Sequence, residues 1–179
     1  MVTWRVVNVV VVARLLKRLT LTDVYKKAKV GSYKPKNFSA LQMKFSNPKA
    51  TAIIFSTGKI TVMGSRDVYS AFNVLRKIRQ LIGVEFVNVS ISNIVVNFDY
   101  GAPINLAGFY ATHSETSNYD SNIFPSCTLK MVGHTVSANI FSSGKVMLTG
   151  IKDLDDVTGF IRVVYEKLQR SRDQQIASN

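Results

Sequence analysis

The residue types that carry acid–base, nucleophilic or metal chemistry are sparse in this sequence of 179 residues. The two histidines, His113 and His134, lack ligand partners at the spacing that metal sites normally show. We find no serine–histidine–aspartate or cysteine–histidine set, no convincing carboxylate pair and no glycine-rich phosphate loop after a strand. We therefore expect no enzyme, no metal site, no cofactor and no small-molecule substrate.

The residues that stand out instead occur twice. Phe55-Ser-Thr-Gly-Lys59 is followed by a β-rich run that ends at Gly64, and Phe141-Ser-Ser-Gly-Lys145 by a similar run that ends at Gly150. Each copy predicts a β-hairpin, with one strand running into the phenylalanine, a short glycine turn, and a second strand that starts at the lysine.

The duplication extends well beyond the hairpins. Residues of the same type recur at an offset of about 86 residues, and near the start the offset is one smaller, which a slip in a loop explains. The matched pairs include Asn8/Asn93, Tyr25/Tyr110, Tyr33/Tyr119, Phe38/Phe124, Lys44/Lys130 and Arg76/Arg162. Two copies of this length predict a pseudo-symmetric pair of lobes. We place the first repeat at 1–83, the second at 84–170, and a polar tail at 171–179, with fraying expected from Gln169.

The net charge of +12 is concentrated in the first repeat. Up to Gly83 the sequence has 16 lysines and arginines against two acidic residues, whereas from Val84 onward seven basic residues face nine acidic ones. This distribution favours nucleic acid as the partner, although a basic solvated face is the common alternative. The single Cys127 predicts a reducing compartment, and no apolar run approaches the roughly 20 residues of a membrane span.

Hydrophobic periodicity predicts the same order of elements in both repeats. The expected strands are Val6–Ala13, Phe38–Phe45, Ala50–Phe55, Val84–Phe98, Phe124–Val132 and Thr135–Phe141, and the expected helices are Leu21–Ala28, Val68–Ile82, Leu106–Ala111 and one from near Asp153 to Leu168. Several strands are apolar at consecutive positions, as in Val9–Val12. Because two helices per repeat cover only one face of a sheet, the other face needs either a further layer or a ligand.

Several motifs in this order resemble one known family. They are Tyr33-x-Pro35-Lys36-x-Phe38, the block Pro48–Lys59, Gly108-x-x-x-Thr112-His113, Phe124-Pro125 and Ile140–Gly150. From roughly Val7 to Leu168 the sequence resembles the core of the TATA-box-binding proteins. The resemblance implies an α+β fold, a pseudo-symmetric saddle in which a curved antiparallel sheet of about ten strands carries helices on its convex face. It also implies that the DNA minor groove covers the concave face.

Carried over by position, the resemblance implies sites for DNA and for protein partners. The expected intercalating residues are Phe38, Phe55, Phe124 and Phe141. The expected base contacts are Asn8, Asn93, Val10, Val95, Thr61, Met63, Met147 and Thr149, and the expected phosphate contacts are Lys44, Lys59, Lys130, Lys145, Thr57 and Ser143. The expected partner-binding residues are Asp120, Asn122 and Ile123 for a B-type (TFIIB-like) initiation factor, and Arg76, Lys77 and Arg79 for other regulators. An A-type factor is a further candidate partner.

The function implied is that of a general transcription initiation factor. It would bind A/T-rich, TATA-like promoter DNA in the minor groove, bend it with the phenylalanine wedges and nucleate the pre-initiation complex. The resemblance places it in the nucleus, or in a viral replication compartment if the source is a virus.

Several departures from the family pattern leave alternatives open. Met63 replaces a threonine, Thr61 and Met147 replace valines, and Asn139 replaces a leucine. One alternative is an interaction module with weak DNA specificity that binds or sequesters initiation factors. Another is a DNA glycosylase, since some carry a domain of similar fold, but we expect no attached catalytic domain with a lysine or aspartate site. Taken singly, the phenylalanines would be core residues, the asparagines polar groups at strand ends and the lysines ordinary turn residues.

Overall fold

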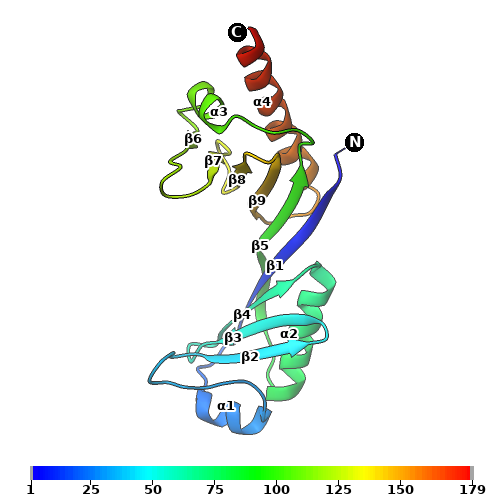
Figure 1. Ribbon diagram of the computed structural model, residues 1–179. Coiled ribbons are helices and arrows are strands. Elements are labelled where there is room, and N and C mark those ends of the chain that lie inside the picture. The colour runs from blue at the N-terminus through cyan, green and yellow to red at the C-terminus, as the bar shows by residue number, and fades with distance from the viewer. Residues whose placement is uncertain (1, 178–179) are drawn as a thin grey trace. The chain divides into compact units, whose positions relative to one another are not determined.

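The computed structural model describes residues 2–177, and within them the chain forms nine strands and four helices (Figure 1). In chain order these are β1 (Trp4–Arg14), α1 (Leu21–Ala28), β2 (Leu41–Ser46), β3 (Lys49–Ile54), β4 (Lys59–Ser65), α2 (Val68–Ile82), β5 (Val87–Asp99), α3 (Leu106–Thr112), β6 (Ser117–Asn118), β7 (Ser126–Lys130), β8 (Ser137–Phe141), β9 (Lys145–Ile151) and α4 (Val157–Ala177). The order of strands and helices repeats, as the duplicated sequence predicts.

The described residues divide into two compact units, and β1 and β5 each contribute to both. The first unit, Val7–Asn93, has the strand order β2-β3-β4-β1. The second unit comprises the chain from Ile94 onward together with the residues before Val7, and has the order β5-β9-β8-β7-β6. Neighbouring β1 and β5 are hydrogen-bonded, so the nine strands belong to one sheet.

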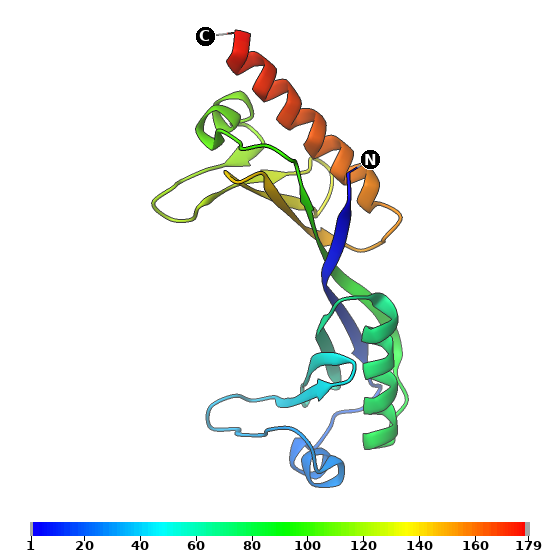
Figure 2. The ribbon, with the colours of Figure 1, turned by 45° about the vertical axis from the view of Figure 1, so that its right-hand side comes forward.

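In the first unit, α2 forms where both ends of an apolar stripe are capped. The Asp67 side chain accepts a hydrogen bond from the Ser70 backbone N–H, and Gly83, with φ +66°, ends the helix by donating to the Arg79 carbonyl. The stripe of Ala71, Val74, Leu75, Ile78 and Ile82 is buried, and α2 packs against β3 and β4. One face of this half of the sheet is therefore covered (Figure 2).

In the second unit, α4 performs the corresponding role. Its buried face consists of Val157, Ile161, Val164, Leu168 and Ser171, and the helix packs against α3. The prediction that the chain frays from Gln169 is wrong, because α4 continues to Ala177 and Ser171 is only 2% exposed. Positions 178 and 179 of the predicted tail lie outside the described residues.

The strands are two-sided, as their consecutive apolar residues indicate. In β1, Val9, Val11 and Ala13 are buried, whereas Val10 and Val12 between them are only half-buried. The same alternation runs through β3, β4, β8 and β9. Successive side chains point to opposite faces of a sheet, so the buried set faces the helices. In each unit the other set forms a face, here called the open face, that no helix of that unit covers.

The strand boundaries differ from the predictions near two phenylalanines. Expected strands from Phe38 and Phe124 begin later, at Leu41 and Ser126. The reason is local, since the backbone N–H groups of Phe38 and Phe124 close turns by donating to the carbonyls of Lys34 and Asp120.

About ten strands were expected, and nine are present in residues 2–177. The short strand β6 pairs with β7, whereas its counterpart in the first repeat is reduced to an isolated bridge between Ser32 and Gln42. None of the helices in this part of the chain is long and apolar enough to span a bilayer.

Candidate nucleic-acid interface

A bulge in the pairing of β1 with β4 fixes the position of Asn8. Val9 pairs with Ser65 and Val11 with Val62, so Met63 and Gly64 together face Val10. Gly64 has φ +92°, a conformation that glycine adopts without strain, and its N–H donates to Asn8 Oδ1 at 2.8 Å. Because the Asn8 oxygen is used, its amide NH₂ is the group left to meet an acceptor.

The equivalent bulge in β5 lies between Ile94 and Val96, and Gly150 has φ +90°. Asn93 and Val95 occupy the positions that match Asn8 and Val10, and both are half-buried. The predicted central pair of asparagines therefore lies on equivalent bulged segments of the two long strands.

The cross-strand register arranges the open face of the first unit in two rows. One row is Lys44–Thr51–Met63, and the other is Gln42–Ile53–Thr61–Val12. Apart from exposed Lys44, these side chains are half-buried. Three of the four predicted base contacts of this repeat, Val10, Thr61 and Met63, therefore lie together on one surface.

The open face of the second unit has matching rows of different chemistry. They are Lys130–Ser137–Thr149 and Thr128–Asn139–Met147–Asn97. Thr128 Oγ1 donates to Asn139 Oδ1 at 2.9 Å. The second row therefore contains polar side chains at the positions where the first unit has Ile53 and Val12.

The four predicted wedges show the same pattern of exposure in both units. Phe38 and Phe124, in the turns before β2 and β7, are 48% and 51% exposed, whereas Phe55 and Phe141, at the hairpins, are half-buried. In the second unit the Phe124 and Phe141 rings lie 6.4 Å apart, edge to face. Because a phenylalanine in a protein core is normally buried, the exposure of Phe38 and Phe124 favours a surface role for these two residues.

The predicted phosphate contacts surround these rings but differ in their neighbours. Lys44, Lys59, Lys130 and Lys145, with Thr57 and Ser143 at the hairpin tips, are all exposed. Among the residues that the structure describes, none of the four lysines takes part in a salt bridge. Across the strands, Lys59 lies opposite Arg14, whereas Lys145 lies opposite Asp99. The positive potential is therefore stronger at the first hairpin.

The residues expected to bind protein partners are exposed, but several already have partners within the chain. Asp120 Oδ1 accepts from the Asn122 N–H at 2.9 Å, and this turn holds Ile123 81% exposed. On α2, Lys77 donates to the Asn47 carbonyl and Arg79 pairs with Glu85.

Arg76 differs from its two neighbours on α2. It is exposed and has no hydrogen-bond or ion-pair partner within residues 2–177. Of the three basic residues expected on this helix, Arg76 is therefore the one whose guanidinium is free to meet another molecule.

Two partly or fully buried groups, His113 and Cys127, have shifted pKa values. Burial lowers the pKa of His113, which stacks on Phe109, and the hydrogen bond to the Phe109 carbonyl opposes that shift. Burial raises the pKa of the Cys127 thiol, and a hydrogen bond with Ser117 opposes it. No cluster of metal-ligating side chains occurs among the described residues.

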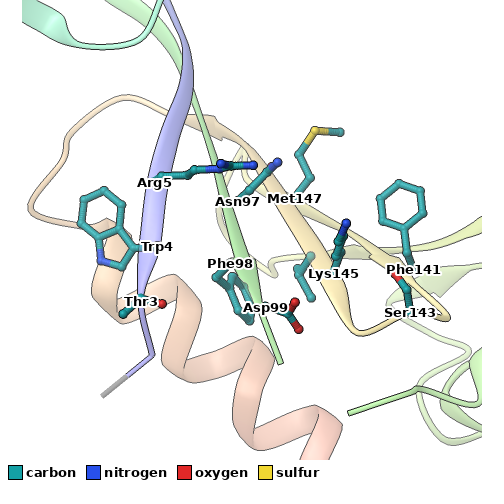
Figure 3. Close-up of a pocket in the computed structure, with 11 residues that line it drawn as sticks. Thr3, Trp4, Arg5, Asn97, Phe98, Asp99, Phe141, Ser143, Lys145 and Met147 are labelled. Carbon is teal, nitrogen blue, oxygen red and sulfur yellow. The ribbon is translucent and has the colours of Figure 1, made fainter. Parts of the chain in front are cut away.

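A groove of about 730 Å³ lies in the second unit, on the side of Phe141, Lys145 and Met147 (Figure 3). Its lining adds Trp4 and Arg5 from the start of β1 and Asn97 from β5. The sequence interpretation did not select these three residues, which have no residue of the same type at the repeat offset and are not among the positions that the resemblance carries over. The alternation of Val95 with Asn97 along β5 could have indicated that Asn97 lies on the open face.

Comparisons with known proteins agree in both sequence and structure. The family model described as transcription factor TFIID, or TATA-binding protein, matches residues 3–83 and 88–171. The TATA-box-binding protein of Saccharomyces cerevisiae is 35% identical over 170 residues, which cover 92% of this chain and 71% of the yeast protein. TATA box-binding protein-like 2 of Rattus norvegicus is 35% identical over 167 residues, covering 90% of this chain. The chain spans only 48% of the rat relative's length.

A solved structure, Methanococcus jannaschii TBP, superimposes with a TM-score of 0.81 at 26% identity. The match covers 93% of this chain and 98% of the archaeal one. The likeness confirms the expected fold class, an α+β fold built from two repeats on an antiparallel sheet.

Proposed function

Because the chain belongs to the TATA-binding protein family, we propose that it is a general transcription initiation factor of the nucleus. It binds A/T-rich, TATA-like promoter DNA in the minor groove, bends it and nucleates a pre-initiation complex. The observation that carries this proposal is the repeated open face, on which half-buried side chains are edged by exposed lysines and by exposed Phe38 and Phe124.

The proposed mechanism of bending uses the phenylalanine pairs. Insertion of apolar side chains between base steps of the minor groove is an established property of this family. Phe38 with Phe55, and Phe124 with Phe141, would enter at the two ends of the site. Unstacking costs a few kcal/mol at each step, and burial of the open face against the widened groove offsets that cost.

In the proposed recognition of the bases, side chains of the protein donate hydrogen bonds to acceptor atoms of the bases. Asn8 uses its oxygen for the Gly64 N–H, so its NH₂ would donate to adenine N3 or thymine O2. Asn93 would act similarly, with Val10, Val95, Thr61, Met63, Met147 and Thr149 packed along the groove floor. Since A·T and T·A pairs both present acceptors there, the preference is for A·T composition over a fixed order of bases.

Phosphate binding would come from the lysines at the edges of each open face. Lys44, Lys59, Lys130 and Lys145 are exposed, and the hydroxyls of Thr57 and Ser143 lie beside two of them at the hairpin tips. These contacts position the duplex without reading its sequence.

Protein partners would use other surfaces. We assign the Asp120–Ile123 turn to a B-type initiation factor, because an 81% exposed isoleucine is an apolar anchor that a partner can bury. Arg76 on α2, with Lys77 and Arg79 beside it, is assigned to regulators such as an A-type factor. Lys77 and Arg79 would first have to leave their partners in this chain.

One observation favours a second candidate function, an interaction module with relaxed DNA specificity. Thr128 and Asn139 form a hydrogen-bonded polar pair on the open face, where an apolar floor would exclude G·C pairs most strongly. Such a module would bind initiation factors without an A/T-dependent change in DNA shape.

The deciding experiment measures affinity and bend angle on a TATA duplex and on a G·C-substituted duplex, by energy transfer between end labels. We expect tight binding with a large bend on the TATA duplex alone. Phe124→Ala should weaken binding about tenfold or more and reduce the bend, because one wedge is lost. Tyr69→Ala, a 72% exposed aromatic on α2, is the matched control and should change neither. Equal affinity for both duplexes, without a bend in either, would contradict the proposal and favour the interaction module.

A further inference from the structure

We propose that the second unit, unlike the first, accommodates one G·C pair in the minor groove, and that Asn97 is the residue that accepts the guanine amino group. The inference rests on the proposed function, since it requires DNA on the open face. It makes the two halves of the pseudo-symmetric protein read different bases.

The first step is the position of Asn97 within its row. Asn97 pairs with Met147 across β5 and β9, and Asn139 pairs with Met147 from the other side. In the first unit the matching row places Val12 opposite Thr61. At the same site on the open face, one unit therefore has a carboxamide and the other an isopropyl group.

The second step is the state of the Asn97 amide. Its Oδ1 is buried and has no hydrogen-bond partner, whereas Asn139 Oδ1 already accepts from Thr128. Asn97 lines the same groove as Arg5, Met147 and Lys145 (Figure 3). Because no hydrogen bond restrains Oδ1, a rotation of the terminal amide can present either the NH₂ or the oxygen without losing one.

The third step is the chemistry of the base pairs. An A·T pair presents only acceptors in the minor groove, and a G·C pair adds the guanine N2 amino group as a donor. An amide that can present either group can pair with both. Val12 can pair with neither, and a guanine amino group facing it would be buried without an acceptor, which is unfavourable.

The fourth step is the charge of the groove beside Asn97. Arg5 and Lys145 line it, and neither takes part in a salt bridge among the described residues. The one acidic residue of the lining, Asp99, uses Oδ1 to accept from the Gly101 N–H at 2.9 Å. Two cations against one carboxylate leave this groove with a net positive charge, which fits a phosphate-flanked base pair better than it fits an apolar peptide.

The test uses a palindromic core of about eight A·T pairs into which G·C is placed at each position in turn. A pseudo-symmetric protein can turn round on such a core, so a single G·C pair can always be placed in the second unit. The wild-type protein should therefore lose less than about threefold in affinity for a single G·C at one position. It should lose about tenfold or more when the mirrored position is also G·C.

Two reciprocal variants identify the residue. Asn97→Val should lose about tenfold or more on the single G·C core, and Val12→Asn should bind the doubly substituted core within about threefold of the A·T core. An inosine·cytosine pair lacks the guanine N2 amino group. Asn97→Val should therefore bind a core with this pair as tightly as it binds the A·T core. Asn97→Ala gives room without an acceptor and should still discriminate against guanine. Binding of each variant to the A·T core shows that it is folded.

The outcomes separate the two proposals. If the wild type and Asn97→Val bind the A·T core equally well and lose equally on the single G·C core, the inference about Asn97 is wrong and minor-groove binding stands. If Asn97→Ala tolerates guanine as well as the wild type, room and not hydrogen bonding explains the tolerance, and the acceptor role is wrong. If no duplex is bound, the proposed function and the inference both fail.

Discussion

Asn8 and Asn97 are both carboxamides on a long strand, yet the chain treats their oxygens differently. Asn8 Oδ1 accepts from the Gly64 N–H that the bulge frees, whereas Asn97 Oδ1 meets no donor. A hydrogen-bonded amide has a fixed orientation, so Asn8 offers the same group to every base pair. Asn97 has no such restraint. Asn8 therefore suits a contact that is strict about the base pair it meets, whereas Asn97 suits a contact that tolerates either base pair.

At the residue scale, the sequence predicts Asn8 but not Asn97, for a physical reason. Asn8 has a partner of its own type at Asn93, and a matched pair is visible in any duplicated sequence. Asn97 corresponds to Val12, so the duplication makes it look like an ordinary change. Its significance depends on the register with Met147 and on an unused oxygen, and both are properties of the folded strand.

His113 gives a prediction about pH. Burial lowers its pKa, and Lys167 and Arg170 add to that effect, while the hydrogen bond to the Phe109 carbonyl opposes it. A histidine whose folded pKa is depressed contributes stability above its unfolded pKa of about 6.5, and that contribution is lost as the pH falls through the folded value. Between about pH 7.5 and pH 5.5, the wild type should therefore lose more unfolding free energy in urea than His113→Gln. Parallel losses in the two proteins would contradict this role.

At the element scale, the hairpin at Phe141 depends on a glycine that no other residue can replace without movement. Gly144 has φ +91°, and a Cβ built there would lie 2.5 Å from the Ala102 carbonyl oxygen. Gly133, in the turn before β8, has φ +77° and nothing within 4 Å of the same point. The two glycines share the backbone requirement and differ in the space around them.

Gly144→Ala should therefore be the more destabilising of two matched variants. Both alanines bear the cost of a left-handed conformation, about 1–2 kcal/mol. Gly144→Ala also has to displace the backbone at Ala102, which adds about 1–3 kcal/mol. Urea unfolding followed by the fluorescence of Trp4, the single tryptophan and part of the same unit, measures the difference. Equal losses in the two variants would show that the Ala102 loop moves freely.

The elements themselves were predictable to different degrees. The helix at Val68–Ile82 has the bounds that its hydrophobic stripe predicts. The length of α4 was underestimated, because the burial of Ser171 depends on its packing in the fold and not on hydrophobicity. Strand starts were misplaced at Phe38 and Phe124, since a turn closed by backbone hydrogen bonds leaves no hydrophobic pattern. These turns are also what leaves the two rings exposed.

At the scale of the whole molecule, two repeats of one fold carry opposite charge balances. Up to Gly83 there are 16 basic residues against two acidic ones, and from Val84 onward seven against nine. The register carries this contrast into the proposed DNA contacts, because Lys59 faces Arg14 across the sheet and Lys145 faces Asp99. A symmetric fold thus presents an asymmetric field to a polyanion.

This asymmetry predicts unequal effects of neutralising the two hairpin lysines. Lys59→Gln should weaken binding to a TATA duplex more than Lys145→Gln, because Lys145 lies beside a carboxylate that already offsets part of its charge. Loss of a full phosphate contact should also reduce the slope of log affinity against log salt by about 1, and that reduction should be larger for Lys59→Gln. Lys26→Gln, in the last turn of α1, is the charge-matched control and should leave the slope unchanged. If the two hairpin variants lose affinity and slope equally, the charge difference between the repeats does not orient the protein on DNA, and the chemistry of the open faces remains as the source of polarity.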